Sequence, residues 1–203
     1  DLDGDSRPDI VAGGVWLRNP GPGAGWSLHR FAAQWSWPHA VAAVHDLNRD
    51  GRPDLVLAPS EPAGKRYRLS WFEAPASREG AWIEHMIDAD VETTHHALAV
   101  ADFDLDGRPD VLTAAMHQGA APQEVKVYFN GGPQRWHKQV LATGGSHNMR
   151  VADLDGDGDP DVFGANWSGE RQGVELWLNQ TCMPEAGCPA WRGYSDRLST
   201  APL

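Results

Sequence analysis

The sequence predicts an all-β fold built from the blades of a β-propeller. An aspartate-rich segment recurs four times along the 203 residues, and its copies start 45, 56 and 51 residues apart. Each copy is followed by a short apolar run, and Gly, Pro and Asn residues separate the runs without helical periodicity. Four short strands in a period of about 50 residues are typical of a propeller blade. We therefore expect four blades, each made of four antiparallel strands.

The strands of each blade follow one order along the chain. The innermost strand comes first and leads into the aspartate-rich segment, and we expect it at 39–46, 96–101 and 147–152. The first blade lacks this strand. A second and a third strand follow the segment, and the outermost strand opens at a tryptophan. The predicted blades are 1–31, 39–87, 95–141 and 147–199 within a domain of 1–199, and 200–203 form a tail. The opening tryptophans, expected in the core or between blades, are Trp26, Trp82, Trp136 and Trp191.

The aspartate-rich segments have the spacing of a calcium loop. Calcium takes six to eight hard oxygen ligands, and alternate residues of a tight loop direct their side chains at one point. We number the positions of each segment from its first aspartate. Positions 1, 3 and 5 are the alternate residues, position 9 supplies a further carboxylate, and a glycine at position 6 allows the positive φ of a sharp turn. The first segment has Ser6 at that position, so its loop is expected to be weaker. The predicted calcium ligands are Asp1, Asp3, Asp5, Asp9, Asp46, Asn48, Asp50, Asp54, Asp102, Asp104, Asp106, Asp110, Asp153, Asp155, Asp157 and Asp161.

An EF-hand is the main alternative for such a loop, but it requires a bidentate Glu at position 12 and flanking helices. Position 12 holds Ala12, Leu57, Thr113 and Gly164, and the flanks have strand composition. We therefore expect hairpin loops. The loop 102–110 should bind calcium better than 46–54, because Asn48 removes one negative charge from the latter. Metal binding and folding should be linked, because the clustered carboxylates repel one another without a cation.

The Asp-x-Asp-x-Asp-Gly-x-x-Asp loops that lead into an apolar strand resemble FG-GAP/VCBS repeats, the blades of integrin-α-like propellers. This resemblance implies calcium binding and a complete ring of about seven blades, so that the remaining blades or other domains would belong to a longer chain. The segment Trp-Leu-Arg-Asn-Pro-Gly (16–21), followed by Gly-Trp-x-x-His (25–29), also resembles the propeller of fungal aldos-2-ulose dehydratase. That second resemblance implies a lyase acting on sugars.

Histidines open the predicted innermost strands. The calcium loops lie at the other end of these strands, so the histidines should gather near the axis on the opposite face, beside the ends of the second strands. Such side chains line a polar channel or bind a ligand, and three imidazoles from adjacent blades would also suit zinc with an open coordination position. His39 stands one residue further from its loop than the others do, so alignment would need a bulge. The predicted ligand-binding residues are His39, His96, His147, His117, Asn166 and Trp167.

Two functions remain open from the sequence. The first is a calcium-stabilised extracellular module that binds a glycan or a protein on the face opposite the calcium loops. The alternative is a sugar lyase or dehydratase domain that uses a histidine-bound divalent metal at the axis. The sequence contains no phosphate-binding loop, serine elbow or Cys/His pair, and it has no paired carboxylates outside the loops, so no catalytic residue is assigned.

Charge and cysteine content bear on partners and location. The net charge of −11 comes mainly from the loops, and no Lys/Arg cluster is present, so nucleic acid is not an expected partner. No apolar stretch is long enough to predict a membrane span. Cys182 and Cys188 suit a disulfide in a Pro/Gly-rich segment, although two free thiols fit the spacing as well. With the calcium loops, these features favour a secreted, cell-surface or periplasmic protein.

Overall fold

A computed structural model of the chain describes residues 1–77, 80–169, 172–181 and 198–200. All regular structure in these ranges is β-strand, and the strands form four antiparallel sheets. The predicted all-β fold is therefore confirmed. No helix in the described ranges is long and apolar enough to cross a membrane. Cys182, Cys188 and Trp191 lie outside the described residues.

Each sheet follows the chain in order. The first contains β1 (Ile10–Ala12), β2 (Val15–Arg18) and β3 (Ser27–Arg30). The second contains β4 (Ala40–His45), β5 (Asp54–Pro59), β6 (Arg66–Glu73) and β7 (Ile83–Glu92). The third contains β8 (His95–Ala101), β9 (Asp110–Ala115), β10 (Val125–Asn130) and β11 (Trp136–Ala142). The fourth contains β12 (Asn148–Ala152), β13 (Asp161–Ala165), β14 (Val174–Asn179) and β15 (Leu198–Thr200).

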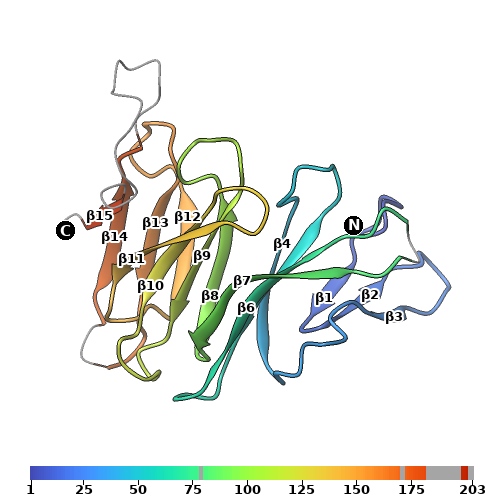
Figure 1. Ribbon diagram of the computed structural model, residues 1–203, viewed down its shortest axis with the longest axis horizontal. Helices are drawn as coiled ribbons and strands as arrows, with labels where there is room; N and C mark the ends of the chain where they lie inside the picture. The colour runs from blue at the N-terminus through green and yellow to red at the C-terminus, as the bar shows by residue number, and fades with distance from the viewer. Residues whose placement is uncertain (78–79, 170–171, 182–197, 201–203) are drawn as a thin grey trace.

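The four sheets stand side by side as blades. Figure 1 shows them in chain order, from the blue first sheet to the red fourth sheet. The strands β4, β8 and β12 are the first of their sheets, and β8 contacts both of the others. They are the predicted innermost strands, and the first blade begins without one, as expected. The second blade extends to Glu92, beyond the predicted limit of 87, because β7 is longer than its counterparts.

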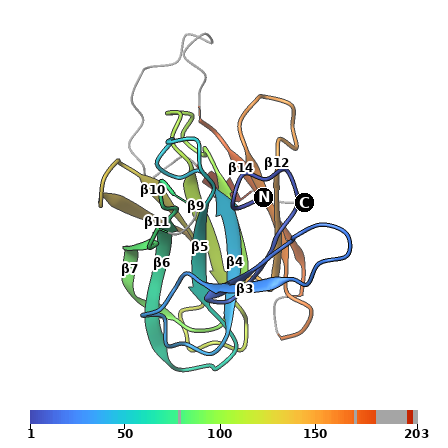
Figure 2. The same cartoon turned by 90° about the vertical axis from the view of Figure 1, so that its right-hand side faces the viewer.

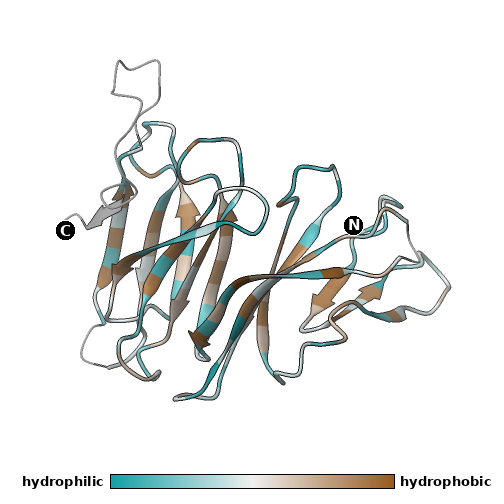
Figure 3. Ribbon diagram, viewed as in Figure 1, coloured by the Kyte–Doolittle hydropathy of each residue, from teal (hydrophilic) through white to brown (hydrophobic). Residues whose placement is uncertain are grey.

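The apolar core lies between neighbouring blades. Figure 3 shows the hydrophobic colour concentrated in the strands and hydrophilic colour in the connecting loops. One cluster joins the first blade to the second around Trp16 and Phe72, and another joins the second to the third around Leu69 and Tyr128. The third cluster joins the last two blades around the fully buried Trp177. Every residue of β5, β9 and β10 is buried, because these strands pack on both faces.

The tryptophans that open the outermost strands do not all pack alike. Trp82 lies 5.4 Å from the ring of Phe31 in the preceding blade, and Trp136 packs against the cluster between the second and third blades. These two confirm the expected packing. Trp26 is 48% exposed, so the expectation is wrong for this residue. It precedes β3, whose residues are all exposed, and no described blade covers that side.

The innermost strands β4 and β12 and their neighbours β5 and β9 all run along one direction of the molecule, so the connections between first and second strands gather at one end (Figure 2). The aspartate-rich segments connect β4 to β5, β8 to β9 and β12 to β13, and all lie at one end. The residues that open the innermost strands lie at the other end. The blade topology therefore separates the predicted calcium loops from the predicted ligand-binding histidines.

Candidate functional site

The aspartate at position 1 stabilises the turn of each loop by accepting backbone hydrogen bonds. In the loop 102–110, the backbone N–H of Asp106 donates to Asp102 at 3.1 Å, and that of Gly107 donates to the other Asp102 oxygen at 2.8 Å. Gly107 has a φ of +86°, and Ser6 is forced to +67° at the same position of the first loop. A serine rarely adopts this φ, so the backbone of the first loop is strained at the position where the sequence lacks the glycine.

The aspartate at position 9 ties each loop to the third strand of its blade. Asp110 is fully buried and accepts the backbone N–H groups of Phe103 at 2.9 Å and Asn130 at 2.7 Å. Burial raises the pKa of Asp110 to about 8. The equivalent Asp54 has a pKa raised to about 6, again mainly by burial. A bound cation would offset this cost of burying a carboxylate.

Three of the four loops gather carboxylates closely enough to share a cation. In each group the oxygens lie within 4.8 Å of one another: Asp1, Asp3 and Asp5; Asp102, Asp104 and Asp110; Asp153, Asp155 and Asp161. Oxygen donors of this kind fit calcium, which would be held by these aspartates. In the remaining loop, the side-chain amide of Asn48 donates to Asp50 at 3.0 Å. Asn48 therefore brings a hydrogen-bond donor into that loop as well as removing a charge.

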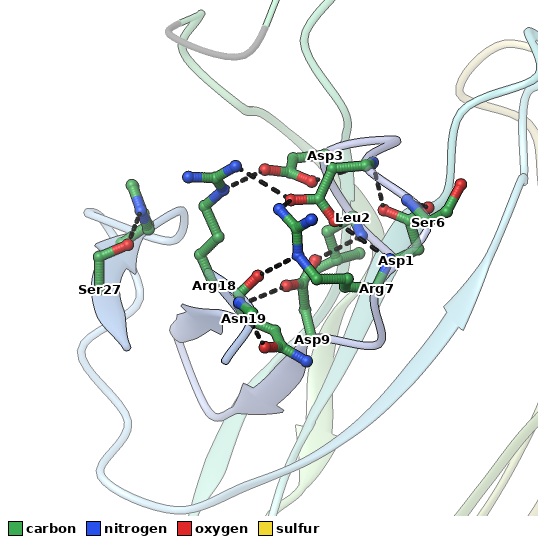
Figure 4. A network of polar contacts seen from close by, with 12 residues as sticks. Asp1, Leu2, Asp3, Ser6, Arg7, Asp9, Arg18, Asn19 and Ser27 are labelled. Atoms are coloured by element: carbon green, nitrogen blue, oxygen red, sulfur yellow. Dashed lines mark hydrogen bonds and ion pairs between the residues drawn. The ribbon is translucent and has the colours of Figure 1, made fainter. Parts of the chain in front are cut away.

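Arginines that the sequence reasoning passed over enter three of the loops. The residue at position 7 forms an ion pair with the aspartate at position 5 in the pairs Arg7–Asp5, Arg52–Asp50 and Arg108–Asp106. In the first loop, Arg18 also contacts Asp3 (Figure 4). The same guanidinium lies 2.9 Å from Asp5. The Arg-Pro dipeptide before the last aspartate of each of these loops was a visible signal. The fourth loop has Asp159 in place of the arginine.

At the opposite face, predicted residues from the third and fourth blades come together. The rings of His96 and His147 lie 4.6 Å apart between centroids. Trp167 is 62% exposed and meets the rings of His147 and His117 edge to face, at 6.2 and 5.7 Å. Burial, followed by the nearby His96, lowers the pKa of His147. We call His96, His117, His147 and Trp167 the histidine–tryptophan patch.

Polar neighbours complete this patch. The Nε2 atom of His96 lies 2.9 Å from a carboxylate oxygen of Glu61, and that of His117 lies 2.7 Å from the hydroxyl of Ser168. Asn166 is buried beneath the patch and donates to the carbonyls of Gly144 and Gly145, both at 3.1 Å. It therefore supports the backbone around Trp167 instead of projecting toward solvent.

His39 does not converge with His96 and His147. Ala40, which follows His39, pairs with Pro59, five residues beyond Asp54. Asn148, which follows His147, pairs with Ala165, only four residues beyond Asp161, so His39 lies one pair further from its calcium loop than His147 does. A bulge between His95 and Ala97 displaces His96 in turn. His39 and His96 still line one hollow. Among the described residues, all groups of three ligands within 4.8 Å are aspartate groups, so zinc at three histidines stays a prediction.

Sequence reasoning missed a groove between the second and third blades on the side of the calcium loops. Its volume is about 270 Å³, and Trp71, Glu73 and Trp136 are among its lining residues. Trp71 stacks on His85 at 4.3 Å between centroids, and His85 Nε2 lies 2.8 Å from Glu73. The first blade repeats the stack with Trp16 on His29, at 4.5 Å. In both blades the tryptophan lies in the third strand and the histidine in the fourth, so the pair was visible in the sequence as a repeat.

His95, beside the patch, should make the protein sensitive to acid. Its ring is fully buried, and burial lowers its pKa to about 3. The unfolded chain takes up the proton near pH 6.5, so stability should fall by about 1.4 kcal/mol per pH unit below that value. Between pH 6.5 and 5, we expect His95→Phe to lose about 2 kcal/mol less than the wild type in urea denaturation. Equal losses in the wild type and in His95→Phe would contradict the assignment.

Comparison with known proteins gives a family and a fold. A family model described as an FG-GAP-like repeat matches residues 1–57, 46–113 and 102–164. No curated protein sequence matches the chain. A solved structure of an Agrocybe aegerita lectin, described as recognising non-reducing terminal N-acetylglucosamine, is similar with a TM-score of 0.55 and 19% identity. The similarity covers 89% of this chain and 48% of the lectin chain, so this chain spans about half the length of the lectin.

Proposed function

Because the chain belongs to the FG-GAP-like repeat family, we propose that it is a calcium-stabilised extracellular β-propeller module that binds a carbohydrate on the face opposite its aspartate loops. The observation that carries the proposal is the exposed Trp167 ring, set among the imidazoles of His117 and His147. A sugar presents an apolar face and a rim of hydroxyl groups. An exposed indole beside imidazoles supplies a flat apolar surface and hydrogen-bonding partners together.

Two further observations support the proposal. Glu61 and Ser168 add an acceptor and a hydroxyl at the edges of the patch, so both donors and acceptors lie within reach of sugar hydroxyls. The similar lectin structure shows that this fold accommodates a sugar-binding protein, although the low identity carries no information about individual residues. A protein ligand on the same face is the alternative within this class.

Replacement of Trp167 provides the test. We expect Trp167→Ala to weaken binding to glycans with terminal N-acetylglucosamine by at least about tenfold, which corresponds to about 1.4 kcal/mol. A glycan array followed by calorimetry would measure the change. Trp26→Ala is the matched control, because Trp26 is also exposed but lies outside the patch. A wild-type chain that binds no glycan, or equal affinities of wild type and Trp167→Ala, would reject the proposed site.

The groove lined by Trp71 and Trp136 is the second candidate position for the sugar. Its stacked Trp71 and His85, with Glu73 at hydrogen-bonding distance from His85, combine an aromatic surface with a charged group in a cavity. Trp136→Ala therefore belongs in the same binding series. A loss confined to this variant would move the sugar site to the groove while leaving the binding function in place.

A sugar lyase or dehydratase with a histidine-bound divalent metal is the alternative function. The close pair of His96 and His147, with Glu61 beside His96, is the observation that favours it. His39 forms no close group of three with them among the described residues, so a metal at this pair would use a different third ligand. Zinc titration of the calcium-saturated protein and of His96→Ala tests this alternative, which fails if no stoichiometric site depends on His96.

A further inference from the structure

The residue at position 7 distinguishes the fourth aspartate loop from the others. In the first three loops, this residue is an arginine whose guanidinium pairs with the aspartate at position 5. Its Nε also donates to a carbonyl at the end of the third strand, as Arg7 does to Asn19 at 2.9 Å and Arg52 to Ala74 at 3.2 Å. These loops therefore carry an internal cation. In the fourth loop, Asp159 occupies this position and adds a negative charge.

Asp159 is buried without a partner. The residue is 1% exposed, and neither carboxylate oxygen has a hydrogen-bond partner within normal geometry among the described residues. The negative charges of Asp157 and Asp161 disfavour its charged form, and the nearby backbone N–H of Thr181 favours it. An unpaired carboxylate in such a place, among other carboxylates, costs several kcal/mol unless a cation compensates it.

The same loop already contains a close group of carboxylates. Oxygens of Asp153, Asp155 and Asp161 lie within 4.8 Å of one another. Asp159 is outside this group, but the charge of Asp161, which belongs to the group, acts on it. A set made only of carboxylate oxygens fits a hard cation that accepts many oxygens, which is calcium rather than zinc. Within the described part of the chain, no arginine forms an ion pair with an aspartate of this loop, in contrast to the first three loops.

We propose that Asp159 is an additional side-chain ligand for calcium and that it makes 153–161 the tightest cation site of the four loops. The inference rests on the proposed calcium binding and goes further, because it ranks the calcium affinities of the four loops. The arginines partly neutralise the first three loops and compete with a bound ion. The first loop should bind most weakly, because Arg7 and Arg18 both reach its aspartates.

Calcium titration by calorimetry tests the proposal on the wild-type chain, Asp159→Asn and Asp159→Arg. Asp159→Asn keeps the shape of the side chain and removes its charge, while Asp159→Arg recreates the residue of the other loops. We expect each variant to weaken the tightest site at least about tenfold, because one charged ligand is lost. The matched control is Asp106→Asn in the third loop, which should leave the tightest site unchanged.

Melting curves give a second readout that a purely structural role would not produce. In EDTA, Asp159→Asn should melt at a higher temperature than the wild type, because it removes repulsion between buried carboxylates. In calcium, its gain in melting temperature should be smaller than that of the wild type. If the wild type binds calcium but Asp159→Asn retains the tightest site, the inference is wrong and the calcium proposal stands. If the wild type binds no calcium at all, both are overturned.

Discussion

Removal of calcium is expected to lower the melting temperature of the protein by roughly 5–11 °C for each site, if the free calcium concentration was about one hundred times the Kd of that site. Saturation at that level contributes about 2.7 kcal/mol, and each kcal/mol shifts the melting temperature of a chain of this size by roughly 2–4 °C. The physical reason is the crowding of carboxylates: three loops each bring three aspartate oxygens within 4.8 Å. Without a cation these groups repel one another in the folded state and separate in the unfolded chain.

Circular dichroism melting curves in EDTA, in millimolar calcium and after back-titration would measure this effect. Magnesium at the same concentration is the control, because its small octahedral shell suits a loop of many carboxylates less well. We expect calcium to restore the full melting temperature and magnesium to restore only part of it. Identical curves in EDTA and in calcium would show that the loops hold their shape without metal, and the calcium assignment would fail.

The second large effect is expected from Asp110→Ala, which should lower the free energy of unfolding by roughly 2–6 kcal/mol. The substitution leaves the buried backbone N–H groups of Phe103 and Asn130 without an acceptor, at about 1–3 kcal/mol each. The loss should be larger in calcium than in EDTA. Burial raises the pKa of Asp110 to about 8, so without a cation part of its contribution is offset by the cost of the buried charge.

Urea denaturation in both buffers would measure this change, with Asp106→Ala as the matched control. Asp106 is exposed and its main side-chain partner is Arg108, so its loss in EDTA should stay within about 1 kcal/mol. If Asp110→Ala were as stable as the wild type in EDTA, Asp110 would act only as a metal ligand. The tie between the loop and the third strand would then contribute nothing measurable.

The local pattern of the sequence was sufficient to predict the blades. Each loop is a short turn in which backbone N–H groups donate to the carboxylate of an aspartate four or five residues earlier, as at Asp102. Such contacts depend on residues close in sequence, so the repeats predicted the loops, the strands that flank them and the missing innermost strand of the first blade. The separation of loops and histidines onto opposite ends followed from the strand order alone.

The tertiary structure decided which of these residues meet. A difference of one pair in the ladder and a bulge at His95 keep His39 from joining His96 and His147, and register depends on contacts between strands. The groove beside Trp71 exists only because two blades pack together, and Trp26 is exposed because no described blade covers it. The sequence by itself determined where the aspartates stand in each loop. Packing of the chain directed the arginines of three loops onto the aspartate at position 5, and it buried Asp159 in the fourth loop.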